Sequence, residues 1–109
     1  MSIEGQNRDP MALLQQWYAG QCDGDWEHTY GIKIDTIDNP GWILTIDLAE
    51  TPLSGQTVQR QLVTRNELDW VQYEVADDKF MACGGPFKLE ELIRCFLCFS
   101  GEAPAQSPT

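Results

Sequence analysis

The sequence predicts a single α+β domain, in which a four- to five-stranded antiparallel sheet carries the N- and C-terminal helices on one face. Apolar residues recur at helical spacing near both ends of the chain. Between these two segments, apolar and polar residues alternate as they do in strands with one buried face. The order of helix, antiparallel strands and helix is typical of an α+β domain.

The two helices differ in how strongly the sequence predicts them. The first begins at Asp9-Pro10, where Asp9 caps the helix and Pro10 takes its first position, and Gly20 marks its end. Its apolar face consists of Leu13, Leu14, Trp17 and Tyr18. The second follows the break at Gly84-Gly85-Pro86. Its apolar residues all fall on one helical face: Leu89, Leu92, Ile93, Phe96 and Leu97.

A hairpin is predicted in the first half of the chain. Residues 30–37 and 42–48 alternate on either side of Asn39-Pro40-Gly41, a sequence typical of a turn. In such a turn proline sets its own φ and the glycine accepts a positive φ. The alternation predicts that the hairpin buries one face.

The second half of the chain predicts the remaining strands. A weaker strand over 57–64 is expected to place Val58 and Leu62 on one face. A clearer strand covers 70–76, and a short one over 79–83 follows a two-residue turn. The sheet is therefore expected to have four or five strands.

The length of 109 residues suits one soluble domain with its own core, which we expect to span 10–100. Residues 1–9 lack apolar periodicity and predict a flexible start, and residues 101–109 predict a disordered tail rich in Pro, Ala and Ser. The N-terminus has no hydrophobic stretch typical of a signal peptide. Four cysteines without an export signal indicate a cytoplasmic protein with reduced thiols.

The chain is strongly acidic. It has 17 Asp and Glu against 7 Lys and Arg, a formal net charge of −10. This charge excludes a general nucleic-acid-binding protein and disfavours a membrane partner. Nucleic acids and anionic membranes are both negatively charged, and a protein binds them through a basic surface. Seven acids lie between Asp23 and Glu50, where Lys33 is the only Lys or Arg. They predict either a negative face or a surface that merely keeps the protein soluble.

Thiols and carboxylates supply weak candidates for catalysis or metal binding. Cys95 and Cys98 form a C-x-x-C pair in the last turn of a predicted helix, where the helix dipole opposes a thiolate. Zinc would need two further ligands, and residues 23–27 lack the calcium-loop pattern, so no metal or other cofactor is expected. Cys22, six residues before the one histidine, and Cys83, in a Gly-rich loop, leave an alternative. It is a small cytosolic thiol-dependent enzyme of sulfurtransferase or hydrolase type.

The four tryptophans fall into two groups. Trp17 and Trp42 lie on predicted core faces. Trp26 lies among carboxylates in a loop and Trp70 takes the polar side of its strand. Both are therefore candidate exposed anchors for a partner protein. The alternative is that both pack beneath the terminal helices.

Several motifs are similar to those of one protein family. They are Leu14-Gln-Gln-Trp-Tyr18, Gln21-Cys-Asp-Gly-Asp-Trp-Glu-His28, Tyr30-Gly-Ile32, Asp38-Asn-Pro-Gly-Trp42, Ile46-Asp-Leu48, Asp69-Trp70, and an ending with Gly84-Gly-Pro, Leu89-Glu-Glu-Leu92 and Phe96-Leu97. Over 14–98 the sequence resembles the immunity protein 53 family. The resemblance implies a bacterial cytoplasmic protein that neutralises a toxin domain of a polymorphic toxin system, and it brings no catalytic residues.

We therefore expect an immunity protein, not an enzyme, that binds a cognate toxin domain through an acidic surface. A basic toxin such as a nuclease suits this surface, because carboxylates can occupy the place of the phosphates in its groove. The expected partner-binding residues are Asp23, Asp25, Trp26, Glu27, Asp35 and Trp70. The sequence favours no oligomeric state.

Overall fold

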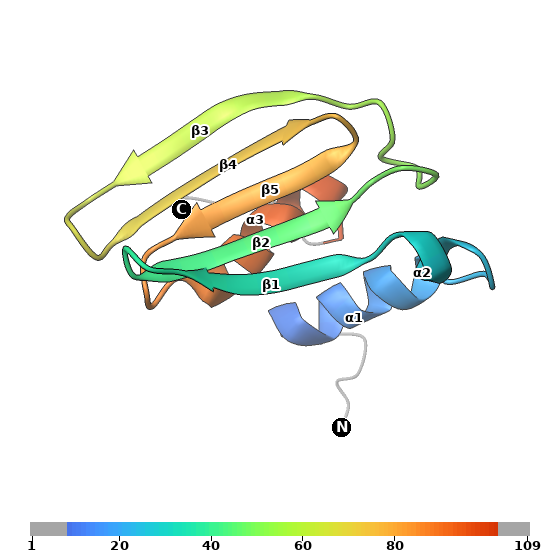
Figure 1. The fold of residues 1–109 in the computed structure, drawn as a ribbon, viewed down its shortest axis with the longest axis horizontal. Coiled ribbons are helices and arrows are strands. Elements are labelled where there is room, and N and C mark those ends of the chain that lie inside the picture. The colour runs from blue at the N-terminus through green and yellow to red at the C-terminus, as the bar shows by residue number, and fades with distance from the viewer. Residues whose placement is uncertain (1–8, 103–109) are drawn as a thin grey trace.

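Residues 9–102 are described in the computed structural model, and they fold as the α+β domain that the sequence predicts (Figure 1). The elements are α1 (Pro10–Gln21), α2 (Trp26–Thr29), β1 (Ile32–Ile37), β2 (Gly41–Asp47), β3 (Val58–Thr64), β4 (Trp70–Ala76), β5 (Lys79–Gly84) and α3 (Leu89–Ser100). Neighbouring strands are antiparallel, in the sheet order β1-β2-β5-β4-β3. The flexible start and disordered tail that the sequence predicts concern mainly 1–8 and 103–109, which lie outside the described residues.

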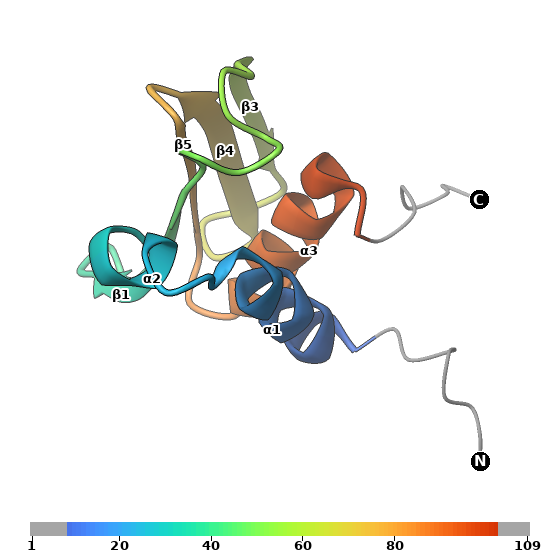
Figure 2. The same ribbon diagram turned by 90° about the vertical axis from the view of Figure 1, so that its right-hand side faces the viewer.

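Both long helices lie on one face of the sheet, which we call the helical face (Figure 2). α3 covers the central strands β2, β5 and β4, and α1 packs against α3. The other face, which we call the open face, is turned toward the viewer in Figure 1, and no helix among residues 9–102 covers it. The helices therefore leave one side of the sheet uncovered.

The core lies between α3 and the central strands. Leu92 and Phe96 of α3 are fully buried, as are Leu44, Ile46 and Phe80 of the sheet. The rings of Phe96 and Phe80 meet edge to face with centroids 5.2 Å apart, a geometry that aromatic pairs prefer. The apolar spacing of the last helix thus predicted its buried face correctly.

α1 begins as the sequence predicts. Asp9 Oδ1 accepts a hydrogen bond from the Met11 amide at 3.2 Å, and Pro10 is the first helical residue. The helix continues through Gln21, one residue beyond the predicted end at Gly20. The end shifts because Gly20 keeps a helical conformation instead of terminating the helix.

The predicted hairpin of β1 and β2 forms, but its turn differs from the prediction. The Asn39–Pro40 peptide bond is cis, and the expectation of a positive φ at Gly41 is wrong. Glycine is needed at position 41 for space, because a Cβ there would collide with the carbonyl oxygen of Gly84 on β5. The predicted burial of one face is also incomplete: Ile34 is 42% exposed, because β1 is an edge strand and α1 packs mainly against α3.

β3 differs from the prediction in the faces that its residues take. A bulge shifts the register between Val58 and Gln61. Val58 lies opposite the buried Val75, whereas Leu62 lies opposite Gln72 on the open face. The expectation that Val58 and Leu62 share a face is therefore wrong, because one extra residue inverts the alternation along the strand.

Candidate partner-binding surface

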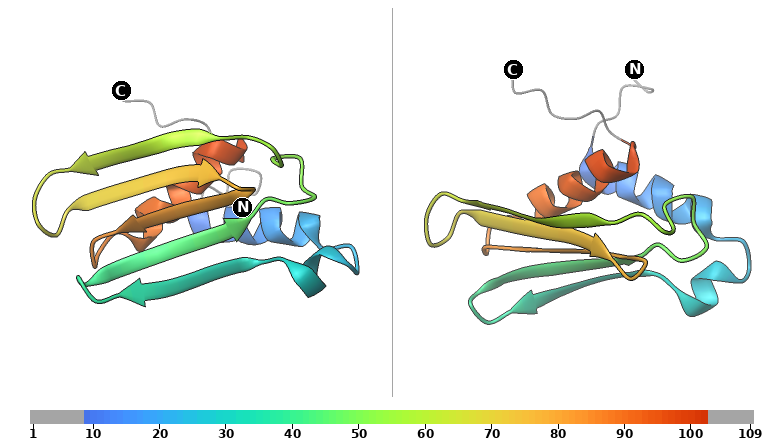
Figure 3. Two further views of the ribbon diagram at one scale, coloured as in Figure 1. Left: turned by 45° about the horizontal axis from the view of Figure 1, so that its top comes forward. Right: turned by 90° about the horizontal axis from the view of Figure 1, so that it is seen from above.

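Three connections meet at one end of the sheet, because the antiparallel order brings the start of β1 beside the end of β2 and the turn before β5 (Figure 3). They are the segments 22–31, 47–57 and 77–79, which together contain seven acidic residues, one lysine and no arginine. The acidic residues are Asp23, Asp25, Glu27, Asp47, Glu50, Asp77 and Asp78. We call this surface the acidic end.

The opposite end of the sheet is nearly balanced in charge. Its connections, 38–40, 65–69 and 84–88, contain three acidic and two basic residues. Asp69 pairs with Lys88 at 2.6 Å and with Arg65 at 3.0 Å, and these two cations hold the pKa of Asp69 below its ordinary value. The negative charge is therefore concentrated at one end of the sheet.

The acidic end is one connected surface, because hydrogen bonds join its three segments. The indole Nε1 of Trp26 in α2 donates to the carbonyl oxygen of Ala49 at 2.9 Å. The carboxylate of Asp78 accepts from Ser54 Oγ at 3.1 Å and from the Gly55 amide at 2.7 Å. The β2–β3 connection is thus held to α2 on one side and to the β4–β5 turn on the other.

The loop before α2 owes its shape to two of its own carboxylates. Asp23 Oδ1 accepts from the amides of Trp26 at 3.0 Å and Asp25 at 2.9 Å, as in an Asx turn. Glu27 accepts from the amides of Asp23 and Gly24, each at 2.9 Å. Backbone amides thus offset the crowding of these acids. The sequence did not predict α2, because it is a single turn whose N-cap residue, Asp25, makes no side-chain capping hydrogen bond.

These hydrogen bonds also shift the acidity of the two carboxyl groups. The amide of Trp26, followed by that of Asp25, lowers the pKa of Asp23. The amide of Glu27 itself, together with those of Asp23 and Gly24, lowers the pKa of Glu27. Both groups are therefore held in their charged forms by the fold.

Trp26 is buried, so the expectation of an exposed anchor is wrong for this residue. Only 2% of its surface is exposed. Its ring lies 6.0 Å from that of Trp17 and 6.1 Å from those of Tyr18 and Tyr30, centroid to centroid. Trp26 therefore supports the acidic end from beneath.

Some carboxylates of the acidic end are paired with a cation or with backbone amides, and others, which we call uncompensated, are not. Asp47 pairs with Lys79 at 2.8 Å, which raises the pKa of Lys79. Asp25, Glu50 and Asp77 are exposed, and no salt bridge within residues 9–102 involves them. Asp23 is exposed as well and forms no salt bridge, but its carboxylate accepts hydrogen bonds from backbone amides.

Asp35 and Trp70 lie away from the acidic end. Asp35 is exposed on the open face of the edge strand β1, opposite Ile43. Trp70 is half-buried at the opposite end of the sheet, where it lies opposite Thr64. The structure therefore brings together Asp23, Asp25 and Glu27 and leaves these two predicted contacts apart from them.

A groove of about 690 Å³ lies between α3 and β4 on the helical face. It is lined by Tyr73, Cys95, Cys98, Phe99 and, at one end, Phe87, which is 83% exposed. The turn that carries Phe87 is fixed, because the adjacent carbonyl of Pro86 accepts a hydrogen bond from Trp42 Nε1 at 3.0 Å. The groove was not predicted from the sequence, in which its one signal is an apolar residue, Phe87, at the break between sheet and helix.

Burial and hydrogen bonding determine the state of three of the four thiols. Burial raises the pKa of Cys95 to about 11 and also raises that of Cys83, which disfavours the reactive thiolate in both. Cys22 Sγ donates to the carbonyl oxygen of Tyr18 at 3.3 Å, and no hydrogen bond in the described chain joins Cys22 to His28. Within residues 9–102 no three His, Cys, Asp or Glu side chains are grouped to hold a metal ion.

The fold and its charge distribution define a small acidic α+β domain. Residues 11–100 match the immunity protein 53 family, and the chain belongs to this family. The match covers α1 from its second residue, the whole sheet and α3, and it includes the acidic end. Neither the curated proteins nor the solved structures contain a match. None of the helices described is long and apolar enough to cross a membrane.

Proposed function

We propose that this immunity protein neutralises a cognate toxin domain by binding it through the acidic end, and not by catalysis. Membership of the family implies a toxin partner. The observation that carries the proposal is the group of exposed carboxylates that form no salt bridge within the described residues, Asp25, Glu50 and Asp77. Charge of this kind accelerates the encounter with a surface of opposite sign.

The partner that fits the acidic end is a basic toxin domain acting in the cytoplasm. A nuclease suits it well, because a groove that binds phosphates is positive. Carboxylates that occupy such a groove exclude the nucleic acid by competition. In this arrangement the immunity protein blocks the toxin and contributes no chemistry of its own.

The partner-binding residues predicted from the sequence have different roles in this proposal. Asp25 meets the toxin directly, whereas Asp23 and Glu27 add charge while they hold the loop. Trp26 keeps the loop in place from below. Asp35 and Trp70 contact a toxin only where it extends over the open face.

The test neutralises two of the uncompensated carboxylates, in the double variant Asp25→Asn with Asp77→Asn. The probe is the toxin domain encoded beside the gene for this chain. We expect the association rate at low salt to fall several-fold, with a smaller change in the dissociation rate. Asparagine is accepted at the positive φ of 56° that Asp77 adopts, so the fold should persist.

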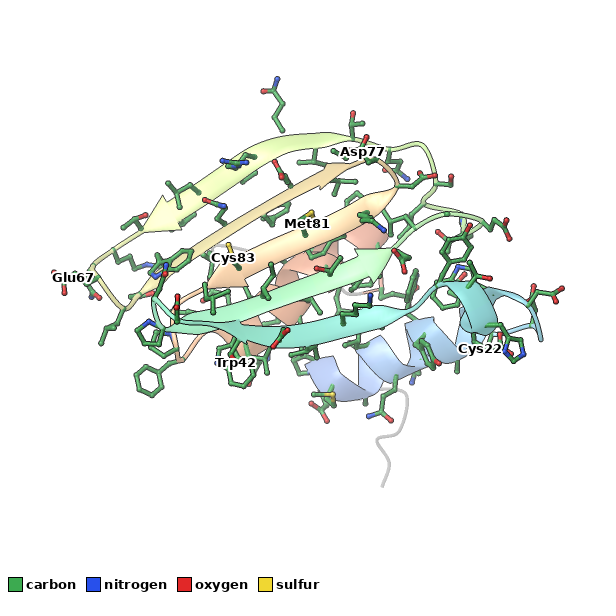
Figure 4. The ribbon with its side chains drawn as sticks, in the orientation of Figure 1. Cys22, Trp42, Glu67, Asp77, Met81 and Cys83 are labelled. Carbon is green, nitrogen blue, oxygen red and sulfur yellow. The ribbon has the colours of Figure 1, made fainter. Side chains whose placement is uncertain are left out.

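The control removes the same amount of charge from the opposite end, in the double variant Asp38→Asn with Glu67→Gln. Figure 4 labels Glu67 and Asp77 at opposite ends of the sheet. The control should keep the association rate of the wild type. Equal slowing by both pairs would contradict the proposal, because it would attribute the effect to the net charge of the molecule.

A further inference from the structure

The outer edge of β3 is an exposed strand edge that nothing in the described part of the chain covers. β3 is the last strand of the sheet and pairs only with β4. Leu62 is 59% exposed and Val63 46% exposed, on opposite faces of this strand. An edge of this kind can add a further strand by backbone hydrogen bonding.

The backbone of β3 directs alternate residues outward. The Arg65 amide donates to the carbonyl oxygen of Asp69 at 2.8 Å, so residue 65 faces the β4 side of the hairpin. In an antiparallel pair, both backbone groups of a residue point to the same side and this side alternates along the strand. Leu62 and Thr64 therefore present their N–H and C=O groups to the outside.

The two edges of the sheet differ in how they are protected against pairing. β1 carries Lys33 and Asp35 at its centre, and charged residues of this kind discourage strand addition. β3 has its bulge and Arg60 near its start, but the segment 61–64 has no charged side chain. The second half of β3 is therefore the less protected edge.

The charge along β3 decides which kind of partner strand can pair with this edge. Residues 51–66 contain Arg60 and Arg65 but no acidic residue, in a chain of net charge −10. Two copies can therefore meet along β3 without placing carboxylates against one another. Arg60 pairs with Glu74 at 3.4 Å and Arg65 pairs with Asp69 at 3.0 Å, so this edge is close to neutral. It therefore offers a basic toxin no excess of negative charge, whereas a second copy can pair there without repulsion.

We propose that the protein forms a homodimer in which β3 pairs antiparallel with β3 of a second copy, about a twofold axis at Leu62. This register sets Leu62 opposite Leu62 of the second copy, and Gln61 opposite Val63. Arg60 then lies opposite Thr64, so no two arginines are direct neighbours across the strands. The pairing joins two five-stranded sheets into one and leaves both acidic ends free.

A contact of one strand pair lies at the small end of specific interfaces, so a monomer–dimer equilibrium is expected. Sedimentation velocity over a range of protein concentrations measures it. The wild type should sediment as a monomer of 12.3 kDa at low concentration and approach twice that mass at high concentration. A wild type that stays monomeric at every concentration would overturn the proposal.

Two variants locate the contact. Leu62→Lys places two ammonium groups against each other at the axis, and Thr64→Pro removes an outward N–H while it spares the bonds to β4. Both should shift the equilibrium at least tenfold toward monomer. The matched control, Ile34→Lys, alters a residue that is 42% exposed on the other edge strand and should dimerise like the wild type.

Circular dichroism and urea unfolding of each variant separate loss of the contact from loss of the fold. A dimer that survives both β3 variants, or one that only Ile34→Lys disrupts, would overturn the proposal. The homodimer proposal would also be overturned if the wild type were monomeric and needed Leu62 to bind the toxin. In that case the edge of β3 would be a toxin-binding site. The toxin-binding proposal is tested separately, since its variants lie at the acidic end.

Discussion

Trp26 Nε1 donates a hydrogen bond to the carbonyl oxygen of Ala49 at 2.9 Å, which joins two loops that are 23 residues apart in sequence. Through this bond the loop with Asp23 and Asp25 is fixed to the connection that carries Glu50. A surface that is already ordered loses less conformational entropy when it binds. The relationship explains why an aromatic residue lies at the centre of an acidic loop.

Trp26 is therefore expected to act on stability. Trp26→Ala removes a residue with 2% of its surface exposed and should lower the free energy of unfolding by about 3–5 kcal/mol. Urea unfolding followed by circular dichroism measures the change. An unchanged midpoint would show that the ring is not packed as described.

Two apolar residues in or beside α3, one buried and one exposed, allow the cost of truncation in the core to be compared with that at the surface. Leu92→Ala should cost about 2–5 kcal/mol, because Leu92 is fully buried. Phe87→Ala removes a larger side chain that is 83% exposed and should cost at most about 0.5 kcal/mol. Equal urea midpoints for the two variants would contradict the packing of this helix.

The free energy of unfolding should fall in acid, partly because carboxylates in and beside the loop before α2 become protonated. The pKa values of Asp23 and Glu27 are lowered from ordinary values of 3.8 and 4.5. A lowered pKa stabilises the folded state above the unfolded value, and this stabilisation is lost as the pH falls through the folded value. The loss from these two groups should therefore begin near pH 4.5 and continue below pH 3.8.

Glu27→Gln should remove part of this acid dependence and lower the urea midpoint at pH 7. Glu67→Gln is the control, because Glu67 is exposed in the β3–β4 turn and no hydrogen bond or ion pair of its side chain occurs within 9–102. Urea midpoints measured from pH 7 to pH 3 compare the two. Parallel curves for both variants and the wild type would show that the carboxylate of Glu27 does not hold the loop.

Glu50 has a φ of 62°, a left-handed conformation that a long side chain rarely adopts. Glu50→Asn should raise the free energy of unfolding by up to about 1 kcal/mol, because asparagine accepts this conformation more readily. It should also slow association with the toxin domain, since it removes an uncompensated charge. A variant that is both less stable and equally fast in binding would assign no role to this carboxylate.

The sequence predicted best what depends on local spacing. The buried face of α3 follows from the positions of Leu92 and Phe96, and the cap at Asp9 follows from its place before Pro10. The bulge after Val58 could not be predicted, because pairing with β4 decides it. The acidic end was predicted only in part, because Asp77 joins it through the order of the strands.

Amide hydrogen exchange of the protein, alone and bound to its cognate toxin domain, tests the central claim most directly. Toxin binding should slow exchange in the segments 22–31, 47–57 and 77–79, which form the acidic end. The groove beside Phe87 should exchange as it does in the free protein. Protection confined to that groove, with unchanged exchange at the acidic end, would contradict toxin binding through the acidic end.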